Sequence, residues 1–382
     1  MIEIKNPEDC CGCSACQSIC AHDAITMQPD VMGFLYPVVN KDRCIDCGLC
    51  EKVCSFNENY DTSLNLPQPD AYAARHKNME EVETSRSGAA FIAISDYILK
   101  QGGVVYGAGY TDHFRVVHKR ATTKEERDEF KGSKYVQSDM NTVFRQVKKD
   151  LKDGMMVLFS GTPCQTSGLA SYIGKRLRKN LYLVDIVCHG VPSPSLWKDY
   201  IAYLERKQGA EICWVNFRDK QQFGWTAHHK FFNGGGKMIF TYLFYQHAMF
   251  RHSCGKCHFC NTKRPSDLTI ADFWGWKKTD PNINADDKGV SLILVNTEKG
   301  RRLFENIKGD LNCIPAKLED CLQGNLQHPS EISPQRMQFE KDYARHGFEY
   351  VIYKYGNVGW RYKVGAFKNR IFSRIKRILR KL

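Results

Sequence analysis

Cysteine is the residue whose number and spacing point to chemistry in this chain. There are 17 cysteines in 382 residues, and nine of them lie between Cys10 and Cys54. Eight of these nine form two runs of the pattern CxxCxxCxxxC, displaced by 34 residues: Cys10, Cys13, Cys16 and Cys20, then Cys44, Cys47, Cys50 and Cys54. A CxxCxxC turn supplies three thiolates to a 4Fe-4S cluster, and a fourth must come from elsewhere.

In two-cluster proteins the fourth cysteine of each run serves the other cluster. We therefore expect Cys54 to complete the first site and Cys20 to complete the second. Structural zinc is the alternative, but a zinc ion uses four ligands and does not require the CxxCxxC triplet. Residues 1–56 resemble a bacterial dicluster ferredoxin domain, with short helices expected over 17–23 and 51–56 and two strands around a turn at Gly33. Cys11 lies outside the pattern, and we interpret it as a bystander.

A third group of cysteines lies farther along the chain. Cys164 follows an apolar strand predicted over 155–159, and Cys188 directly follows the next strand, predicted over 181–187. The carboxyl ends of neighbouring parallel strands share one crevice, so both thiols are expected to face it. A CxxC turn can complete a third four-thiolate site with Cys254 and Cys257, and Cys260 is a competing ligand. In the alternative, Cys164 and Cys188 are small buried side chains, and zinc is bound by Cys254, Cys257 and Cys260 with His252 or His258.

The elements that position these residues alternate between strands and helices from residue 71 onward. This alternation predicts an α/β domain with a mostly parallel sheet over 71–345, after a polar linker with two prolines at 57–70. Antiparallel strands around a Gly-Gly-Gly turn are predicted as an insertion, at residues 211–219, 226–232 and 237–241.

Five ordered motifs in this domain resemble the coenzyme F420 hydrogenase/dehydrogenase beta-subunit family. They are Ser85-Arg-Ser-Gly88, Lys131 to Ser138, Gly161-Thr-Pro-Cys-Gln165, Cys188-His-Gly-Val-Pro192 and Ser266 to Gly275. The resemblance covers residues 70–345 and implies a flavin, usually FAD, beside a 4Fe-4S cluster. It assigns that third cluster to Cys164, Cys188, Cys254 and Cys257 and leaves Cys260 open.

The resemblance also implies flavin contacts in three segments of the chain. Ser87 and Gly88 begin a predicted helix, where free backbone N–H groups favour a phosphate, although an ordinary N-cap serine has the same pattern. The second segment combines two cations, a hydroxyl and an aromatic ring in Lys131, Ser133, Lys134 and Tyr135, and a solvated turn is its alternative. Thr162 is expected to touch the flavin ring beside Cys164.

An iron-sulfur cluster transfers one electron at a time, whereas a hydride acceptor takes two. A flavin can convert between these one-electron and two-electron steps. The resemblance therefore implies a flavin-dependent iron-sulfur oxidoreductase between ferredoxin or another redox protein and an unidentified substrate. Similar fusions suggest surface-polysaccharide biosynthesis. The alternatives are an electron-transfer adaptor without substrate chemistry and a zinc-dependent interaction protein. No catalytic acid is assigned; we interpret His189 as orienting the cluster loop and Asp272 as a turn residue.

The net charge of +13 is concentrated at the C-terminus. Residues 354–382 hold ten basic and no acidic side chains, which leaves the rest of the chain at +3. A basic C-terminal tail is expected over 346–382. Within it, apolar residues at helical spacing make 361–382 a basic amphipathic helix, suited to an anionic membrane surface, to a partner or to the protein's own core. Nucleic-acid binding is not expected, because aromatic interleaving and any nucleic-acid motif are absent. Without a signal peptide or an apolar span, a cytoplasmic protein is expected, in contact with the inner face of the membrane if the tail binds there.

Overall fold

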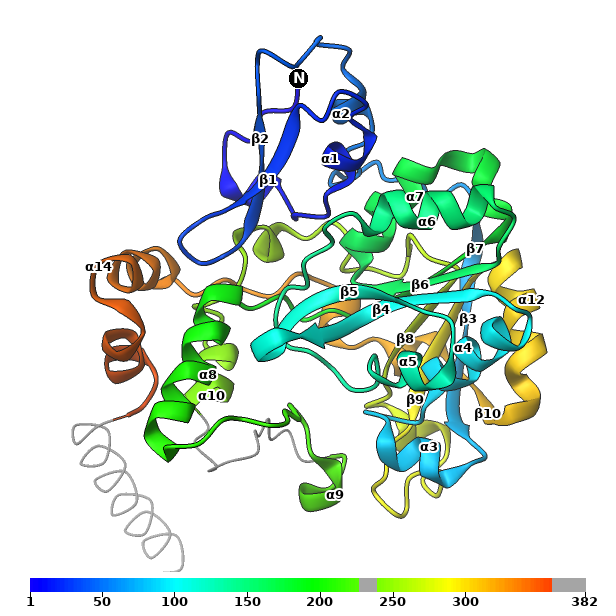
Figure 1. Cartoon of the computed structure of the whole chain (residues 1–382). Helices are drawn as coiled ribbons and strands as arrows, with labels where there is room; N and C mark the ends of the chain where they lie inside the picture. Colours follow the sequence, from blue (N-terminus) through cyan, green and yellow to red (C-terminus); the bar gives the residue numbers. More distant parts are fainter. Residues whose placement is uncertain (227–238, 359–382) are drawn as a thin grey trace, which may run out of the picture.

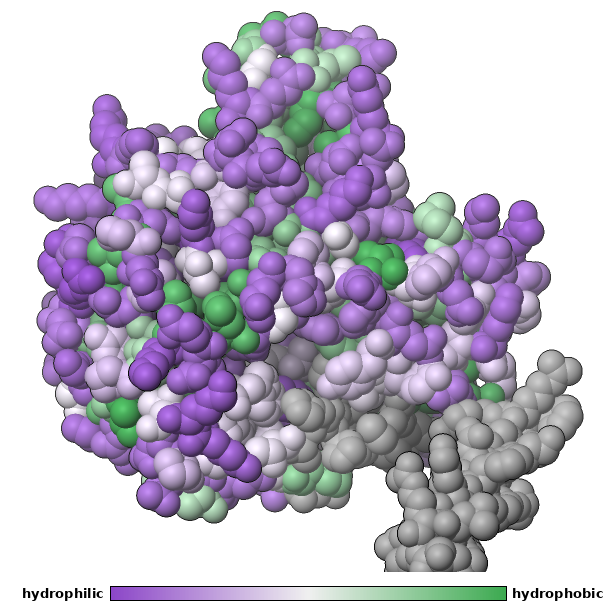
Figure 2. Space-filling model, turned by 180° about the vertical axis from the view of Figure 1, so that it is seen from behind, coloured by the Kyte–Doolittle hydropathy of each residue, from purple (hydrophilic) through white to green (hydrophobic). Residues whose placement is uncertain are grey.

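A computed structural model describes residues 1–226 and 239–358. A small N-terminal domain sits on a larger α/β domain (Figure 1). From behind, the small domain stands out as a knob, and polar residues cover most of that face (Figure 2). None of the helices in the described part of the chain is long and apolar enough to cross a membrane.

The N-terminal domain consists of a hairpin and short helical segments. Strands β1 (Ile25–Pro29) and β2 (Leu35–Val39) pair in antiparallel register around Gly33, which has a φ of +80°. The predicted strands are therefore confirmed. The helices α1 (Ala15–Ile19) and α2 (Leu49–Lys52) begin and end earlier than expected, each just before the last cysteine of its run.

Within the described residues, the α/β domain is built on an eight-stranded mixed sheet of order β10-β3-β9-β8-β7-β6-β4-β5. The pairs β4/β6, β6/β7 and β7/β8 are parallel, and the other pairs are antiparallel. The predicted α/β domain is thus present, with its parallel strands at the centre of a mixed sheet. The strands are β3 (Asn65–His76), β4 (Val104–Thr111), β5 (Arg115–Ala121), β6 (Val157–Gly161), β7 (Leu181–Ile186), β8 (Leu268–Asp272), β9 (Ser291–Thr297) and β10 (Leu311–Ala316).

Helices cover both faces of this sheet, because successive strand residues point to opposite sides. Val157 and Phe159 pack with helices α6 and α7, whereas Leu158 between them packs with α4 and α12. The helices of this domain are α3 (Met79–Thr84), α4 (Ala90–Lys100), α5 (Lys124–Asp128), α6 (Val143–Lys152), α7 (Pro163–Leu177), α8 (Pro194–Gln208), α9 (Lys220–Phe223), α10 (Ile239–Tyr245), α11 (Trp276–Thr279), α12 (Glu298–Ile307), α13 (Leu318–Cys321) and α14 (Arg336–Tyr355). Single turns of 3₁₀ helix are η1 (Pro7–Asp9), η2 (Asp112–Phe114), η3 (Arg178–Asn180), η4 (His252–Lys256), η5 (Lys308–Asp310) and η6 (Gly324–Leu326).

The predicted antiparallel insertion is wrong where the structure describes it. Residues 211–219 form no strand, and residues 239–245 form helix α10, which buries Ile239, Phe240 and Leu243 against α8 and α14. Aromatic and β-branched residues have high strand propensity, but here the core shared with α8 and α14 favours a helix. Residues 227–238, including the glycine turn, lie outside the described residues.

Two predicted boundaries also differ. Strand β3 begins at Asn65, inside the segment predicted as a linker, and pairs with β9. Helix α14 runs through residues 345 and 346, where the tail was expected to begin, and bends at Gly347, which has a φ of +76°. The amphipathic segment 361–382 lies outside the described residues.

The buried side chain of Arg251 ties the two domains together. It is 1% exposed; its Nε donates to the Cys10 carbonyl oxygen at 2.8 Å, and its Nη2 donates to that of Leu35 at 2.9 Å. Nη1 donates to Gln137 Oε1 at 3.0 Å, and the guanidinium lies 4.2 Å from the Tyr36 ring centre. Apolar packing adds to this contact, since Met32 and Phe34 share a core with α8 and α10.

Replacing Arg251 with Met is expected to loosen the N-terminal domain. The variant leaves the Cys10 and Leu35 carbonyls without their buried donor, at a cost of about 3 kcal/mol. We expect a lower thermal midpoint and faster proteolytic cleavage in the mostly exposed segment 57–64. Arg115→Met is the control, because Arg115 makes its ion pair with Asp139 while 63% exposed, and such pairs contribute less than about 1 kcal/mol. Equal cleavage rates in the two variants would show that Arg251 does not hold the domain.

Candidate functional site

The eight N-terminal cysteines fall into two groups in space. The thiols of Cys10, Cys13 and Cys54 are all close enough to that of Cys16 to raise its pKa electrostatically, although burial is the larger cause. The other four line a small cavity at the far end of the domain: Cys20, Cys44, Cys47 and Cys50. Each group thus contains three cysteines of one run and the fourth of the other.

Backbone N–H groups point at several of these sulfurs. Ile2 N lies 3.2 Å from Cys50 Sγ, and the amides of Gly12 and Ala24 each lie 3.4 Å from a cysteine Sγ, those of Cys10 and Cys20. Left-handed residues turn the loops inward, among them Ser14 with a φ of 65°. Amide donors of this kind stabilise thiolates, so the loops suit an anionic sulfur centre.

The later cysteines also come together, at the carboxyl end of the parallel strands. Cys164 lies in the first turn of α7 after β6, Cys188 follows β7, and Cys254 lies in η4. Burial raises the pKa of Cys188 well above its usual value, and the nearby thiols of Cys254, Cys164 and Cys257 raise it further. Val191 N lies 3.4 Å from Cys254 Sγ. The structure therefore gathers all four expected ligands.

Cys260 belongs to the same neighbourhood. Its thiol is hydrogen-bonded to that of Cys257, which lowers the pKa of Cys260, and it also interacts with Cys188 and Asn325. Five thiols thus lie close together, one more than a four-thiolate site uses. Within residues 1–226 and 239–358, no three Cys, His, Asp or Glu side chains meet around a point that suits a single metal ion.

Cys11 lies between the first N-terminal group and the later group, and the interpretation of it as a bystander missed this position. Its buried thiol interacts with those of both Cys13 and Cys164. The interaction with Cys11 is the main cause that lowers the pKa of Cys164 to about 7. Residue spacing could not predict the contact between Cys11 and Cys164, because these residues lie about 150 positions apart.

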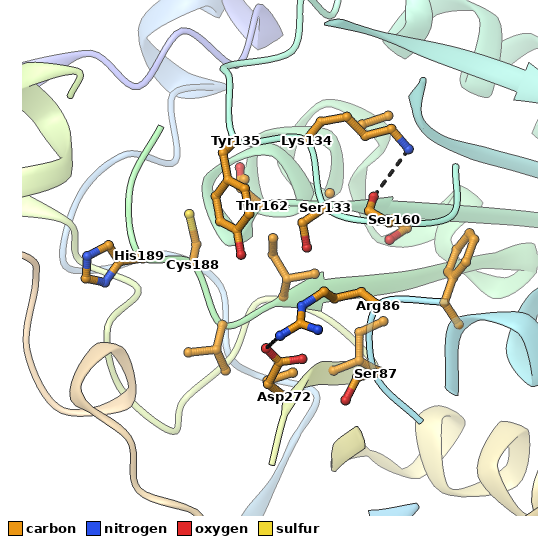
Figure 3. Close-up of a pocket in the computed structure, with 18 of the residues that line it drawn as sticks. Arg86, Ser87, Ser133, Lys134, Tyr135, Ser160, Thr162, Cys188, His189 and Asp272 are labelled. Atoms are coloured by element: carbon orange, nitrogen blue, oxygen red, sulfur yellow. Dashed lines mark hydrogen bonds and ion pairs between the residues drawn. The ribbon is translucent and has the colours of Figure 1, made fainter. Parts of the chain in front are cut away.

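A cavity of about 450 Å³ opens beside the later cysteines. Six of the seven residues predicted to contact a flavin line it, together with Cys188: Ser87, Lys131, Ser133, Lys134, Tyr135 and Thr162. In Figure 3, Tyr135, Thr162 and Ser133 lie on one side of the cavity, and Arg86, Ser87 and Asp272 lie on the other. Thr162 also contacts the cysteine group directly, with its Oγ1 3.1 Å from Cys164 Sγ.

Gly88 does not line this cavity. A Cβ atom at Gly88 would lie 2.3 Å from the Ala74 carbonyl oxygen and 2.7 Å from Ser291 N, so glycine allows the start of α4 to approach β3 and β9. Ser87 does not cap the helix, because its hydroxyl donates to the Val290 carbonyl oxygen at 2.6 Å. This pair therefore fixes the helix start against the sheet.

The two lysines that were predicted to contact the flavin have partners within the protein. Lys131 pairs with Glu81 at 2.7 Å and Asp128 at 3.0 Å. Lys134 donates to the carbonyl oxygens of Glu129 and Lys131, both at 2.8 Å, and burial lowers its pKa to about 7. Both ammonium groups hold the loop in place, and Ser133 and Tyr135 present their side chains to the cavity (Figure 3).

Several cavity residues were not predicted to contact a ligand. Asp272 at the end of β8 binds the guanidinium groups of Arg86 and Arg218, and is more than a turn residue. Both ring nitrogens of His189 have a hydrogen-bond partner. Nδ1 lies 2.9 Å from Asn325 Oδ1, and Nε2 lies 2.8 Å from His247 Nε2. These pairings could not be predicted from residue spacing, because every one joins distant segments.

His118 lies in a fully buried network on the cavity wall. Its Nε2 lies 3.0 Å from the Ser160 carbonyl oxygen, and its Nδ1 lies 2.8 Å from Ser138 Oγ. Because only a protonated nitrogen can donate to the carbonyl, Nε2–H donates there and Nδ1 accepts from Ser138. Gln165 Nε2 donates to the same hydroxyl at 2.9 Å. Burial lowers the pKa of His118 to about 4.

Two models of known protein families match separate parts of the chain. Residues 9–57 match the model of the 4Fe-4S dicluster domain, and residues 154–317 match that of the C terminus of the beta subunit of coenzyme F420 hydrogenase/dehydrogenase. Among solved structures, the chain is similar to one from the xenon-derivatized F420-reducing NiFe hydrogenase complex of Methanosarcina barkeri. The TM-score is 0.47 at 15% identity, covering 75% of this chain and 91% of that chain. No curated protein matches the sequence.

The low pKa of His118 predicts a pH-dependent loss of stability. The unfolded chain takes up a proton near pH 6.5, and the folded chain does so only near pH 4, so stability is full above pH 6.5 and falls as the pH drops to 4. The loss is about 3 kcal/mol. In His118→Gln, the difference in thermal midpoint from the unmodified protein should therefore shrink or reverse between pH 6.5 and 4. The same substitution at exposed His346 should leave the pH profile unchanged; a parallel profile for His118→Gln would contradict the assignment.

Proposed function

We propose that this chain is an iron-sulfur oxidoreductase. It combines a segment that matches a 4Fe-4S dicluster domain with one that matches the C terminus of the coenzyme F420 hydrogenase/dehydrogenase beta subunit. These families make it an iron-sulfur protein related to electron-transfer oxidoreductases. The proposal is that it holds a third 4Fe-4S cluster and a flavin, usually FAD in this family. It would exchange electrons between ferredoxin or another redox protein and a hydride-accepting substrate.

One observation carries the proposal. Cys188 and Thr162, which contacts Cys164, line the same cavity as Ser133 and Tyr135. A redox centre held by these cysteines would therefore adjoin whatever the cavity binds. The volume of about 450 Å³ is in the range of cofactor and ligand pockets.

The cysteine groups fit three four-thiolate centres. We assign one N-terminal cluster to Cys10, Cys13, Cys16 and Cys54, and the other to Cys44, Cys47, Cys50 and Cys20. The mixed grouping of the two runs and the amides near sulfur support this assignment. We assign the third cluster to Cys164, Cys188, Cys254 and Cys257. Cys260 then stays a thiol beside Cys257, next to Asn325.

The cavity residues fit a flavin in a particular way. A bound flavin supplies the conversion between single electrons and a hydride. The Tyr135 ring is held edge-on by Phe217 and Phe244, with centroid distances of 5.5 and 5.1 Å, so it is a fixed aromatic wall. Ser133 and Thr162 bring hydroxyl groups to the cavity, while Lys131 and Lys134 act by fixing the loop that carries Ser133 and Tyr135.

Two further predictions concern the C-terminal tail and the biosynthetic role of the protein. Contact of residues 361–382 with a membrane surface concerns residues outside the described part of the chain. A place in surface-polysaccharide biosynthesis rests on the family resemblance alone. Neither is needed for the electron-transfer function.

Flavin content and its reduction test the proposal. The protein purified without oxygen should retain about one flavin per chain, and reduced ferredoxin should reduce that flavin. Cys188→Ala should keep the flavin, because Cys188 supplies only one side of the cavity, but should slow its reduction by about tenfold or more, because one cluster ligand is lost.

Cys313→Ala is the matched control, since Cys313 lies half-buried in strand β10, outside the cavity lining. It should retain both the flavin and the unmodified rate. A protein that binds clusters and no flavin would instead be an electron-transfer adaptor. Equal rates in the two cysteine variants would reject the role of Cys188.

A further inference from the structure

The cavity wall that carries Arg86, Arg218 and Asp272 holds more positive than negative charge. Arg86 Nη2 and Arg218 Nη1 both contact Asp272 Oδ2, at 3.1 and 2.7 Å. The other carboxylate oxygen, Oδ1, accepts from the indole of Trp225 at 3.3 Å. Figure 3 shows Arg86 reaching Asp272 along the cavity wall. One carboxylate therefore serves two guanidinium groups, which we call the Arg86/Arg218 pair.

A third cation stands next to this pair. Lys220 Nζ donates to the carbonyl oxygens of Ser87 at 3.1 Å and of Lys288 at 2.6 Å, and also to that of Val82. Burial and the charge of Arg86 lower the pKa of Lys220 to about 7. Even with Lys220 neutral, the Arg86/Arg218 pair and Asp272 have a net charge of +1.

This positive charge is removed from water. The side chains of Arg86 and Arg218 are 11% and 7% exposed. The Nε atoms of both are buried, and neither has a hydrogen-bond partner among the described residues. Buried charges and donors without partners are costly, and a ligand that supplies an anion offsets part of that cost.

The surrounding residues strengthen such an interaction. The Arg218 guanidinium lies 5.4 Å from the Trp274 ring, which stacks on Trp225 at 4.7 Å. Aromatic walls keep the local dielectric constant low, and charge interactions are stronger there. Arginine also presents paired donors that match the oxygens of carboxylate and phosphate.

We propose that the Arg86/Arg218 pair binds an anionic group, a phosphate or a carboxylate, on the molecule that occupies this cavity. This inference rests on the proposed function, in which the molecule is either the hydride-accepting substrate or the flavin. The flavin would bind through its pyrophosphate. In both cases Arg218 is a binding residue and Asp272 is the internal counter-charge that limits the affinity for the anion. Variants of the two residues should therefore have opposite effects.

Inorganic phosphate is the probe, and tryptophan fluorescence of the holoprotein is the signal, since Trp225 and Trp274 lie at the site. If the anion belongs to the substrate, the holoprotein should bind phosphate. Arg218→Gln should weaken that binding at least tenfold and keep the flavin, whereas Asp272→Asn should strengthen it severalfold. Arg301→Gln removes one positive charge from a surface pair with Asp70 and should match the unmodified protein.

If the anion belongs to the flavin, the holoprotein should not bind phosphate, and Arg218→Gln should lose the flavin while Arg301→Gln keeps it. The proposal is overturned if the unmodified protein binds phosphate and Arg218→Gln binds it with the same affinity. It is also overturned if the unmodified protein does not bind phosphate and Arg218→Gln keeps its flavin. An unmodified protein that binds phosphate through Arg218 but contains no flavin would retain the anion site and reject the proposed function.

Discussion

The position of one buried cation determines how the two parts of this molecule meet. The charge of Arg251 acts on thiols from both sides of the junction, those of Cys10 and Cys13 in the small domain and those of Cys164 and Cys254 in the large one. Thiolate centres on either side would repel each other, and a guanidinium between them offsets that repulsion. Carbonyl and amide oxygens from both domains accept its hydrogens, which lowers the cost of burying it.

The sheet provides the second constraint. Because β6 and β7 are parallel neighbours, the residues that follow them share one edge, and Cys164 and Cys188 come together there. The turn that carries Cys254 begins directly after Arg251, so the residue that docks the small domain also positions the remaining cysteines. Cys11 lies in the same junction, where its thiol interacts with those of Cys13 and Cys164. The two cysteine groups on either side of the junction and the cavity therefore depend on the same contact.

Residue spacing predicted what is local or follows from strand order. The two cysteine runs, the strands around Gly33 and the placement of Cys164 and Cys188 after neighbouring strands belong to this class. The pairings of Arg251, Cys11 and Arg218 join segments far apart in the chain, and their neighbours are not readable from the sequence. Residues 239–245 show a different limit: their aromatic and β-branched side chains favour a strand, but burial against α8 and α14 makes them a helix.

The central claim is that the α/β domain holds its own cluster in addition to the two of the N-terminal domain. Iron and acid-labile sulfide per chain, measured on protein purified without oxygen, test this most directly. We expect about twelve of each, because three 4Fe-4S clusters contain that number. A value of about eight that does not rise after reconstitution with iron and sulfide would contradict the third cluster.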